Sequence, residues 1–201
     1  MSRPFGDLFA VELPEWLRAR RAQLPDSFDD LDDLVGALNE LAATNVAEGT
    51  GGPFAAAVIE TDTGRLVSVG VNLVLSSQLS LAHAEMVALG FAHARVGSWD
   101  LSETGKSHTL VVNAQPCAMC CGAVVWSGVK ALDFSVFGAE VEALTGFDEG
   151  PVALDWRGQL EARGIRVTVG RLADDARRVL GDFGAKARRG QITLYNARSS
   201  G

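Results

Sequence analysis

The sequence is short of positive charge: 18 Lys and Arg residues stand against 25 Asp and Glu residues, giving a formal net charge of −7. Because binding to a polyphosphate backbone depends on surplus Lys and Arg, this balance argues against a nucleic-acid partner. A long hydrophobic run is also missing, since the longest apolar stretch, Cys117 to Trp126, is about half of a membrane span. The N-terminal residues 1–7 have no basic stretch leading into an apolar one. We therefore predict neither a secretory nor a membrane address and expect a cytoplasmic protein.

Cysteine, histidine and tyrosine are rare, with three, three and one residues respectively. Cys117 and Cys120 have C-x-x-C spacing and Cys121 follows directly, which excludes a disulfide framework and is typical of a metal or redox site in a reducing compartment. Hydrophobic residues make up 47% of the chain and charged residues 21%, as in an ordinary globular protein. These features together predict one domain that acts on a small ligand.

Hydrophobic periodicity and breaker residues divide the chain into an N-terminal arm (1–25), a main domain (26–190) and a C-terminal tail (191–201). Two locally paired strands come first, and later strands alternate with helices. This order predicts an α/β fold, a three-layer α/β/α sandwich around a central mixed five-stranded sheet. The predicted strands are 54–60, 66–72, 108–113, 131–136 and 165–169, and the predicted helices are 14–22, 31–46, 81–95, 117–127, about 152–163 and 171–190, with a polar segment at 139–150.

One histidine and two cysteines form a candidate metal site. His83 precedes Glu85 by two residues, and Cys117 and Cys120 follow Pro116 at the start of a predicted helix. Residues i and i+3 lie on one helical face, so both sulfurs can bind one ion. Zinc accepts thiolate and imidazole ligands, and a catalytic zinc site keeps its fourth position for water. Glu85 is then placed to move protons to and from that water.

Other interpretations of these residues remain open. A lone C-x-x-C also occurs in redox pairs and in structural zinc sites. A closed structural site needs a fourth ligand, and Cys121 points about 100° around the helix from Cys120. His93 and His108 have no matching partners in the sequence, so we assign neither to the metal.

The zinc motif and several further segments resemble the cytidine deaminase-like superfamily, and within it most closely the bacterial guanine deaminases. The pattern H-x-E with P-C-x-x-C is the motif of zinc-dependent nucleobase deaminases. Further matches are the Gly-Pro-Phe at 52–54, Asn72, the helix ending at Trp126, the acidic segment 140–148, and the tail ending Tyr195-Asn196.

The resemblance implies the roles of specific residues. Glu85 would be the first catalytic carboxylate and Glu142 the second, with Glu140 as its competitor. Asn72 would bind the base through its amide, Phe54 and Trp126 would form aromatic walls, and Tyr195 would cover the site. Ala84, between His83 and Glu85, is assigned to substrate binding.

The resemblance also implies a function, the zinc-dependent hydrolysis of guanine to xanthine and ammonia. Alternatives with the same chemistry are the deamination of another purine, guanosine, cytosine or an amino-triazine, or of adenosine in tRNA. A non-enzymatic zinc module is an alternative of another class. Relatives form dimers, so a homodimer is expected, with a C-terminal tail that is exchanged between subunits in some members.

Overall fold

A five-stranded mixed sheet forms the centre of the protein, whose structure is a computed structural model describing residues 10–196. The strands are β1 (Ala55–Glu60), β2 (Leu66–Val71), β3 (His108–Val112), β4 (Ala131–Phe134) and β5 (Arg166–Val169), in the spatial order β2-β1-β3-β4-β5. β1 pairs antiparallel with β2 and with β3, whereas β3, β4 and β5 are parallel. This arrangement confirms the predicted mixed sheet with five strands.

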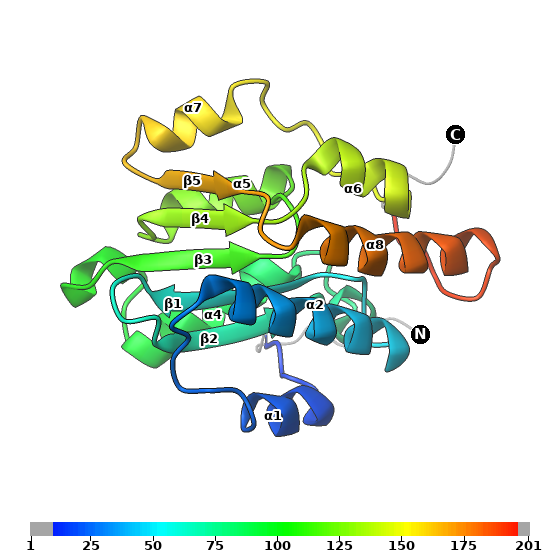
Figure 1. The fold of residues 1–201 in the computed structure, drawn as a ribbon, viewed down its shortest axis with the longest axis horizontal. Coiled ribbons are helices and arrows are strands. Elements are labelled where there is room, and N and C mark those ends of the chain that lie inside the picture. Colours follow the sequence, from blue (N-terminus) through cyan, green and yellow to red (C-terminus); the bar gives the residue numbers. More distant parts are fainter. Residues whose placement is uncertain (1–9, 197–201) are drawn as a thin grey trace, which may run out of the picture.

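Helices cover both faces of the sheet. In Figure 1, α2 (Leu31–Ala47) and α8 (Ala173–Arg188) lie in front of the sheet, and α4 (Ala84–Val96) and α5 (Ala118–Trp126) lie behind it. The predicted three-layer sandwich is therefore confirmed. The remaining helical elements are α1 (Glu15–Arg21), α3 (Val74–Ser77), η1 (Leu101–Thr104), α6 (Gly138–Thr145) and α7 (Trp156–Glu161).

The hydrophobic core consists of two main clusters, one on each face of the sheet. Alternate residues of β1 belong to different clusters because successive side chains of a strand point to opposite faces. Ile59 packs with Leu34 and Leu38 of α2, whereas Val58 belongs to the cluster that contains Leu89 of α4. Every residue of β1 and β2 is buried, as expected for strands covered on both faces.

The described part of the N-terminal arm packs against the main domain. The predicted helix at 14–22 is present as α1, and its Leu17 is fully buried. Leu13 and Leu17 belong to the same core cluster as α2 and β1, so residues 10–25 contribute to the main domain. Residues 1–9 of the arm and residues 197–201 of the tail lie outside the described residues.

Two other expectations differ from the structure. The polar segment predicted at 139–150 contains α6, because Val141 and Thr145 are buried on its inner side while Glu140 forms an ion pair with Arg177 of α8. The helix expected over about 152–163 is shorter, since α7 spans only Trp156–Glu161. Residues 151–153 have no regular structure and residues 154–155 form a turn that leads into α7.

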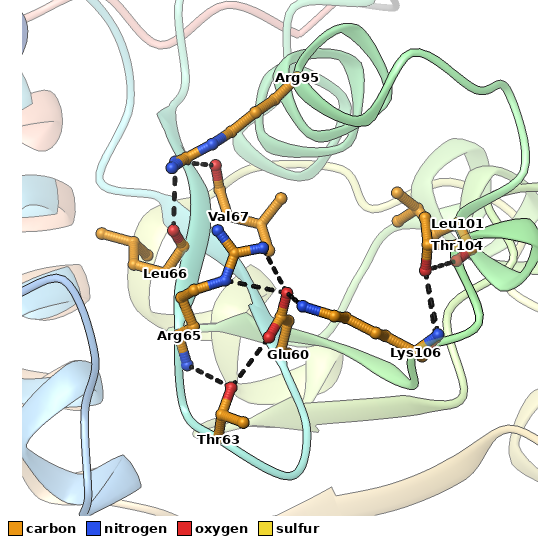
Figure 2. Close-up of polar contacts among 9 residues, drawn as sticks. All are labelled: Glu60, Thr63, Arg65, Leu66, Val67, Arg95, Leu101, Thr104 and Lys106. Carbon is orange, nitrogen blue, oxygen red and sulfur yellow. Dashed lines mark hydrogen bonds and ion pairs between the residues drawn. The ribbon is translucent and has the colours of Figure 1, made fainter.

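The buried carboxylate of Glu60 stabilises the turn between β1 and β2 through hydrogen bonds and ion pairs. This turn lies at the end of the sheet opposite to the predicted metal ligands. Figure 2 shows Arg65, Lys106 and Thr63 around Glu60. Lys106 Nζ lies 2.6 Å and Arg65 Nε 2.9 Å from Glu60 Oε1, and the Glu60 side chain is only 4% exposed. The hydrogen bond from Arg65, assisted by that from Lys106, lowers the pKa of Glu60 to about 2.

Glu60→Gln is expected to destabilise the fold at neutral pH by about 1–2 kcal/mol, because both cations reach Glu60 from solvent and the amide still accepts hydrogen bonds. The folded-state pKa lies below the unfolded value, so this contribution is complete above about pH 4.5 and is lost as the pH falls toward 2. Urea unfolding of both proteins at pH 7 and pH 3 tests this. An equal difference at both pH values would contradict it.

Candidate active site

Three predicted ligands meet at the carboxyl ends of β3 and β4. His83 is the N-cap of α4, Cys117 is the N-cap of α5, and Cys120 lies in the first turn of α5. The Nδ1 atom of His83 lies 3.5 Å from Sγ of Cys117 and 3.7 Å from Sγ of Cys120. Zinc bonds of about 2.0 Å to nitrogen and 2.3 Å to sulfur at a tetrahedral angle put the two atoms about 3.5 Å apart. The geometry therefore fits a zinc ion.

The two thiols differ in their readiness to ionise. The hydrogen bond from Cys120 and the adjacent His83 lower the pKa of Cys117 to about 4. The hydrogen bond to Cys117, followed by burial, holds the pKa of Cys120 well above its usual value. Metal binding requires both sulfurs as thiolates, so zinc binding at this pair is expected to release a proton.

Glu85 lies in the first turn of α4 beside the metal ligands. Its side chain is buried and lines the cavity described below. Burial, followed by the negative charge of Cys117, raises the pKa of Glu85 to about 7. A carboxyl group with a pKa in this range can both accept and release a proton at neutral pH.

A cavity of about 340 Å³ opens over the metal ligands. This volume is at the lower end of small-molecule sites, which suits a single small planar ligand. Its walls include the predicted substrate-binding residues Phe54, Asn72 and Tyr195. The ring of Phe147 lies 5.6 Å from that of Phe54 and 4.8 Å from that of Tyr195, so an aromatic cluster forms one wall.

Besides Glu85, the exposed Asp148 and the half-buried Glu149 line this cavity, whereas Glu142, the predicted second carboxylate, does not. Glu142 is exposed and lies outside the cavity lining, where its carboxylate accepts a 3.2 Å hydrogen bond from the Glu149 backbone. Its competitor Glu140 pairs with Arg177 at 2.7 Å. Glu149 lines the cavity, and burial together with the charges of Cys117 and Glu85 raises its pKa to about 8.

The turn after α6 explains this difference. Gly146 adopts a left-handed backbone conformation (φ 85°) that ends α6, and the ring of Phe147 is buried directly after it. The chain reverses there, so Glu142 stays outside and Glu149 reaches the metal ligands. The sequence signal for this was a glycine turn followed by a buried aromatic residue, which directs the next acidic residues inward.

The family model of the cytidine and deoxycytidylate deaminase zinc-binding region matches residues 32–136, about half of the chain. The chain belongs to this family. It is a zinc-dependent aminohydrolase, and the matched region contains all three metal ligands and Glu85.

Several relatives of this deaminase are known. The guanine deaminase of Nitrosomonas europaea, a solved structure, is 42% identical over 91% of this chain and 100% of that one, with a TM-score of 0.84. Two solved structures of the protein NE0047 are also 42% identical to this chain, each with a TM-score of 0.85. The complex with 8-azaguanine covers 91% of this chain and 99% of that one. The complex with 2,6-diaminopurine covers 96% of this chain and 98% of that one. The guanine deaminase of Bacillus subtilis is 33% identical over 54% of this chain and 65% of its own length, less than two thirds. Matches to tRNA-specific adenosine deaminases cover less than half of those proteins.

Two predicted substrate-binding residues of the deaminase lie outside the cavity lining. Trp126 is 78% exposed at the far end of α5, because a helix rising about 1.5 Å per residue carries it about 12 Å beyond Ala118. Ala84 is fully buried in the core cluster behind the sheet. Neither side chain therefore forms part of the cavity wall, and the assignment of these two residues to substrate binding stays a prediction.

The remaining cysteine and histidines stay outside the metal group, as expected. Cys121 Sγ lies 3.3 Å from the Pro116 carbonyl, and His93 Nε2 lies 3.2 Å from the Ser127 carbonyl. His108 is buried in β3. Among residues 10–196, the only group of three potential metal ligands is His83, Cys117 and Cys120, which leaves a fourth position free for chemistry.

Among residues 10–196, none of the helices has the length and apolar character required to cross a bilayer.

Proposed function

We propose that this deaminase hydrolyses guanine to xanthine and ammonia, an activity that belongs to purine catabolism. The observation that carries the proposal is one small cavity lined by the metal ligands, by the buried Glu85 and the half-buried Glu149, whose pKa values are raised, and by the amide of Asn72. The names of the relatives from Nitrosomonas europaea and Bacillus subtilis, and the purines in the NE0047 structures, support it.

The proton movements follow from the two carboxyl groups. Bound zinc supplies a water of lowered pKa as the nucleophile. Glu85 accepts a proton from this water as the C2–O bond forms, and delivers it to the adjacent ring nitrogen. The neutral carboxyl group of Glu149 donates its proton to the exocyclic amine as the C2–N bond breaks, and it regains a proton from the C2 hydroxyl group as the C2 carbonyl forms and ammonia leaves. Phe54 and Tyr195 exclude solvent from the base.

The other candidate substrates can be distinguished from guanine by experiment. The net charge of −7 disfavours tRNA, and the short matches to adenosine deaminases of tRNA are confined to part of the chain. We would measure ammonia release by the zinc-loaded protein with guanine, guanosine, adenine, cytosine, an amino-triazine and tRNA. Guanine is expected to give the highest kcat/KM. High turnover of another compound, with none of guanine, would overturn the substrate while leaving the metal chemistry intact.

We also infer a cytoplasmic homodimer. Thiolate ligands remain reduced in the cytosol, which favours that compartment. The exposed side of α5 carries Met119, Gly122 and Trp126 at i, i+3 and i+7, and the helix has no charged residue. Such an uncharged stripe is suited to self-association of a chain with net negative charge. The tail contacts the cavity of its own chain, and its exchange between subunits would use the same contacts.

Trp126→Glu is expected to convert the dimer to a monomer at micromolar concentration, because a charge would be buried in an apolar interface. Leu154→Glu is the matched control, since Leu154 is also exposed and lies outside α5. Light scattering after size exclusion gives the mass of each protein. A monomeric parent protein, or a dimeric Trp126→Glu variant, would refute this interface.

A further inference from the structure

The carboxamide oxygen of Asn72 is surrounded by donors. The Tyr195 hydroxyl donates to Oδ1 at 2.6 Å, the Val74 backbone N–H at 3.2 Å, and the Gly52 backbone N–H at 3.3 Å. Asn72 is only 2% exposed, and its own backbone carbonyl is held by the Asn45 amide at 2.7 Å. Three donors on one oxygen fix both the position and the orientation of this side chain.

These contacts decide which amide atom faces the cavity. If nitrogen and oxygen were exchanged, the amide hydrogens would point at two backbone N–H groups, which can only donate. The oxygen must therefore lie toward Gly52 and Val74. Asn72 lines the cavity, and its Nδ2 atom has no acceptor among residues 10–196. At this point the cavity presents a donor to its ligand.

Tyr195 supplies the shortest of the three bonds, and its own position is well defined. Its ring packs 4.8 Å from that of Phe147, and its hydroxyl is also close to the Gly52 backbone N–H. A Cβ atom at Gly52 would lie 2.6 Å from the Tyr195 hydroxyl, so only glycine leaves room for it. Burial raises the pKa of Tyr195, so the hydroxyl keeps its proton and remains a donor.

We propose that Tyr195 is a positioning residue that sets substrate specificity: together with the Gly52 and Val74 backbone N–H groups, its hydroxyl holds the Asn72 amide with the nitrogen toward the cavity, so the site selects purines with a carbonyl oxygen at C6 over purines with an amino group there. This proposal rests on the proposed guanine deaminase function. An amino group at C6 would place two donors against each other in a buried site, where an unpaired polar group is costly.

The experiment compares guanine with 2,6-diaminopurine, which carries an amino group in place of the C6 carbonyl. Tyr195→Phe keeps the ring and removes only the hydroxyl. For guanine we expect KM to rise about tenfold with kcat within about threefold, and for 2,6-diaminopurine kcat/KM within about twofold. The preference for guanine thus falls about tenfold. Equal losses for both bases, or an unchanged ratio, would overturn the proposal.

Asn72→Asp provides a second test. In this variant the oxygen that faces Tyr195 still accepts its hydrogen bond. The second carboxylate oxygen replaces the amide nitrogen at the cavity, so this position accepts a hydrogen bond where the parent protein donates one. The substrate preference should therefore invert from guanine to 2,6-diaminopurine. Zinc content and thermal midpoint establish that each variant is folded. If the parent protein turns over no guanine, the proposed function fails. The role of Tyr195 is then decided by the ratio of dissociation constants for the same two bases, which should shift about tenfold if the proposal holds and stay unchanged if it does not.

Discussion

Glu85→Gln is expected to keep its zinc and to lose ammonia release by about a thousandfold or more in kcat, since glutamine cannot exchange a proton. The side chain is buried in the first turn of α4, beside the ligands, without being one of them. Glutamine has nearly the same shape, so the metal ligands should not move. Steady-state ammonia release and zinc content by elemental analysis are measured on the same preparation.

Two results would argue against this role of Glu85. Turnover close to that of the parent would show that another group moves the protons. Loss of zinc along with activity would indicate that Glu85 holds the metal site together, and its proton transfer would then be unproven. Glu142→Gln is the matched control, because Glu142 is an exposed carboxylate outside the cavity lining.

Glu149→Gln is expected to lower kcat by about a hundredfold while KM for guanine changes by less than about fivefold. The reason is that a carboxyl group at the amine assists its departure, and the amide retains hydrogen-bonding capacity for the bound base. Glu142→Gln should leave both constants within about twofold, because its amide oxygen still accepts from the Glu149 backbone. Stopped-assay kinetics on both variants separate these expectations.

The pair of variants also tests the assignment of the second carboxylate. If Glu142→Gln lost activity and Glu149→Gln retained it, the expectation drawn from sequence resemblance would be right and the interpretation of the cavity wrong. If both variants kept full activity, the second carboxylate would have no part in the reaction.

The sequence was most informative where function depends on local spacing. His83 and Glu85 lie at the start of α4, and Cys117 and Cys120 lie at the start of α5. Helix geometry alone therefore brings the members of each pair close together. Short apolar runs bounded by turn residues likewise predicted all five strands, because most residues of these strands are buried.

Prediction failed where a side chain's position depends on a turn or on distance along a helix. Glu149 reaches the cavity only because the chain reverses at Gly146, and no periodic pattern encodes that reversal. Trp126 shares a helix with the metal ligands but lies at its far end. The orientation of the Asn72 amide was also beyond the sequence, since it depends on backbone donors at Gly52 and Val74 and on the hydroxyl of Tyr195, which is 123 residues away.

The most direct test is a crystal structure of the zinc-loaded protein with 8-azaguanine, with anomalous data collected at the zinc edge. We expect a single zinc peak bonded to His83, Cys117 and Cys120. The C2 amine of the base should lie beside Glu149, with Glu85 near the ring nitrogen and the Asn72 nitrogen donating to the C6 oxygen. A zinc peak elsewhere, or a base whose amine points away from both carboxyl groups, would contradict this account.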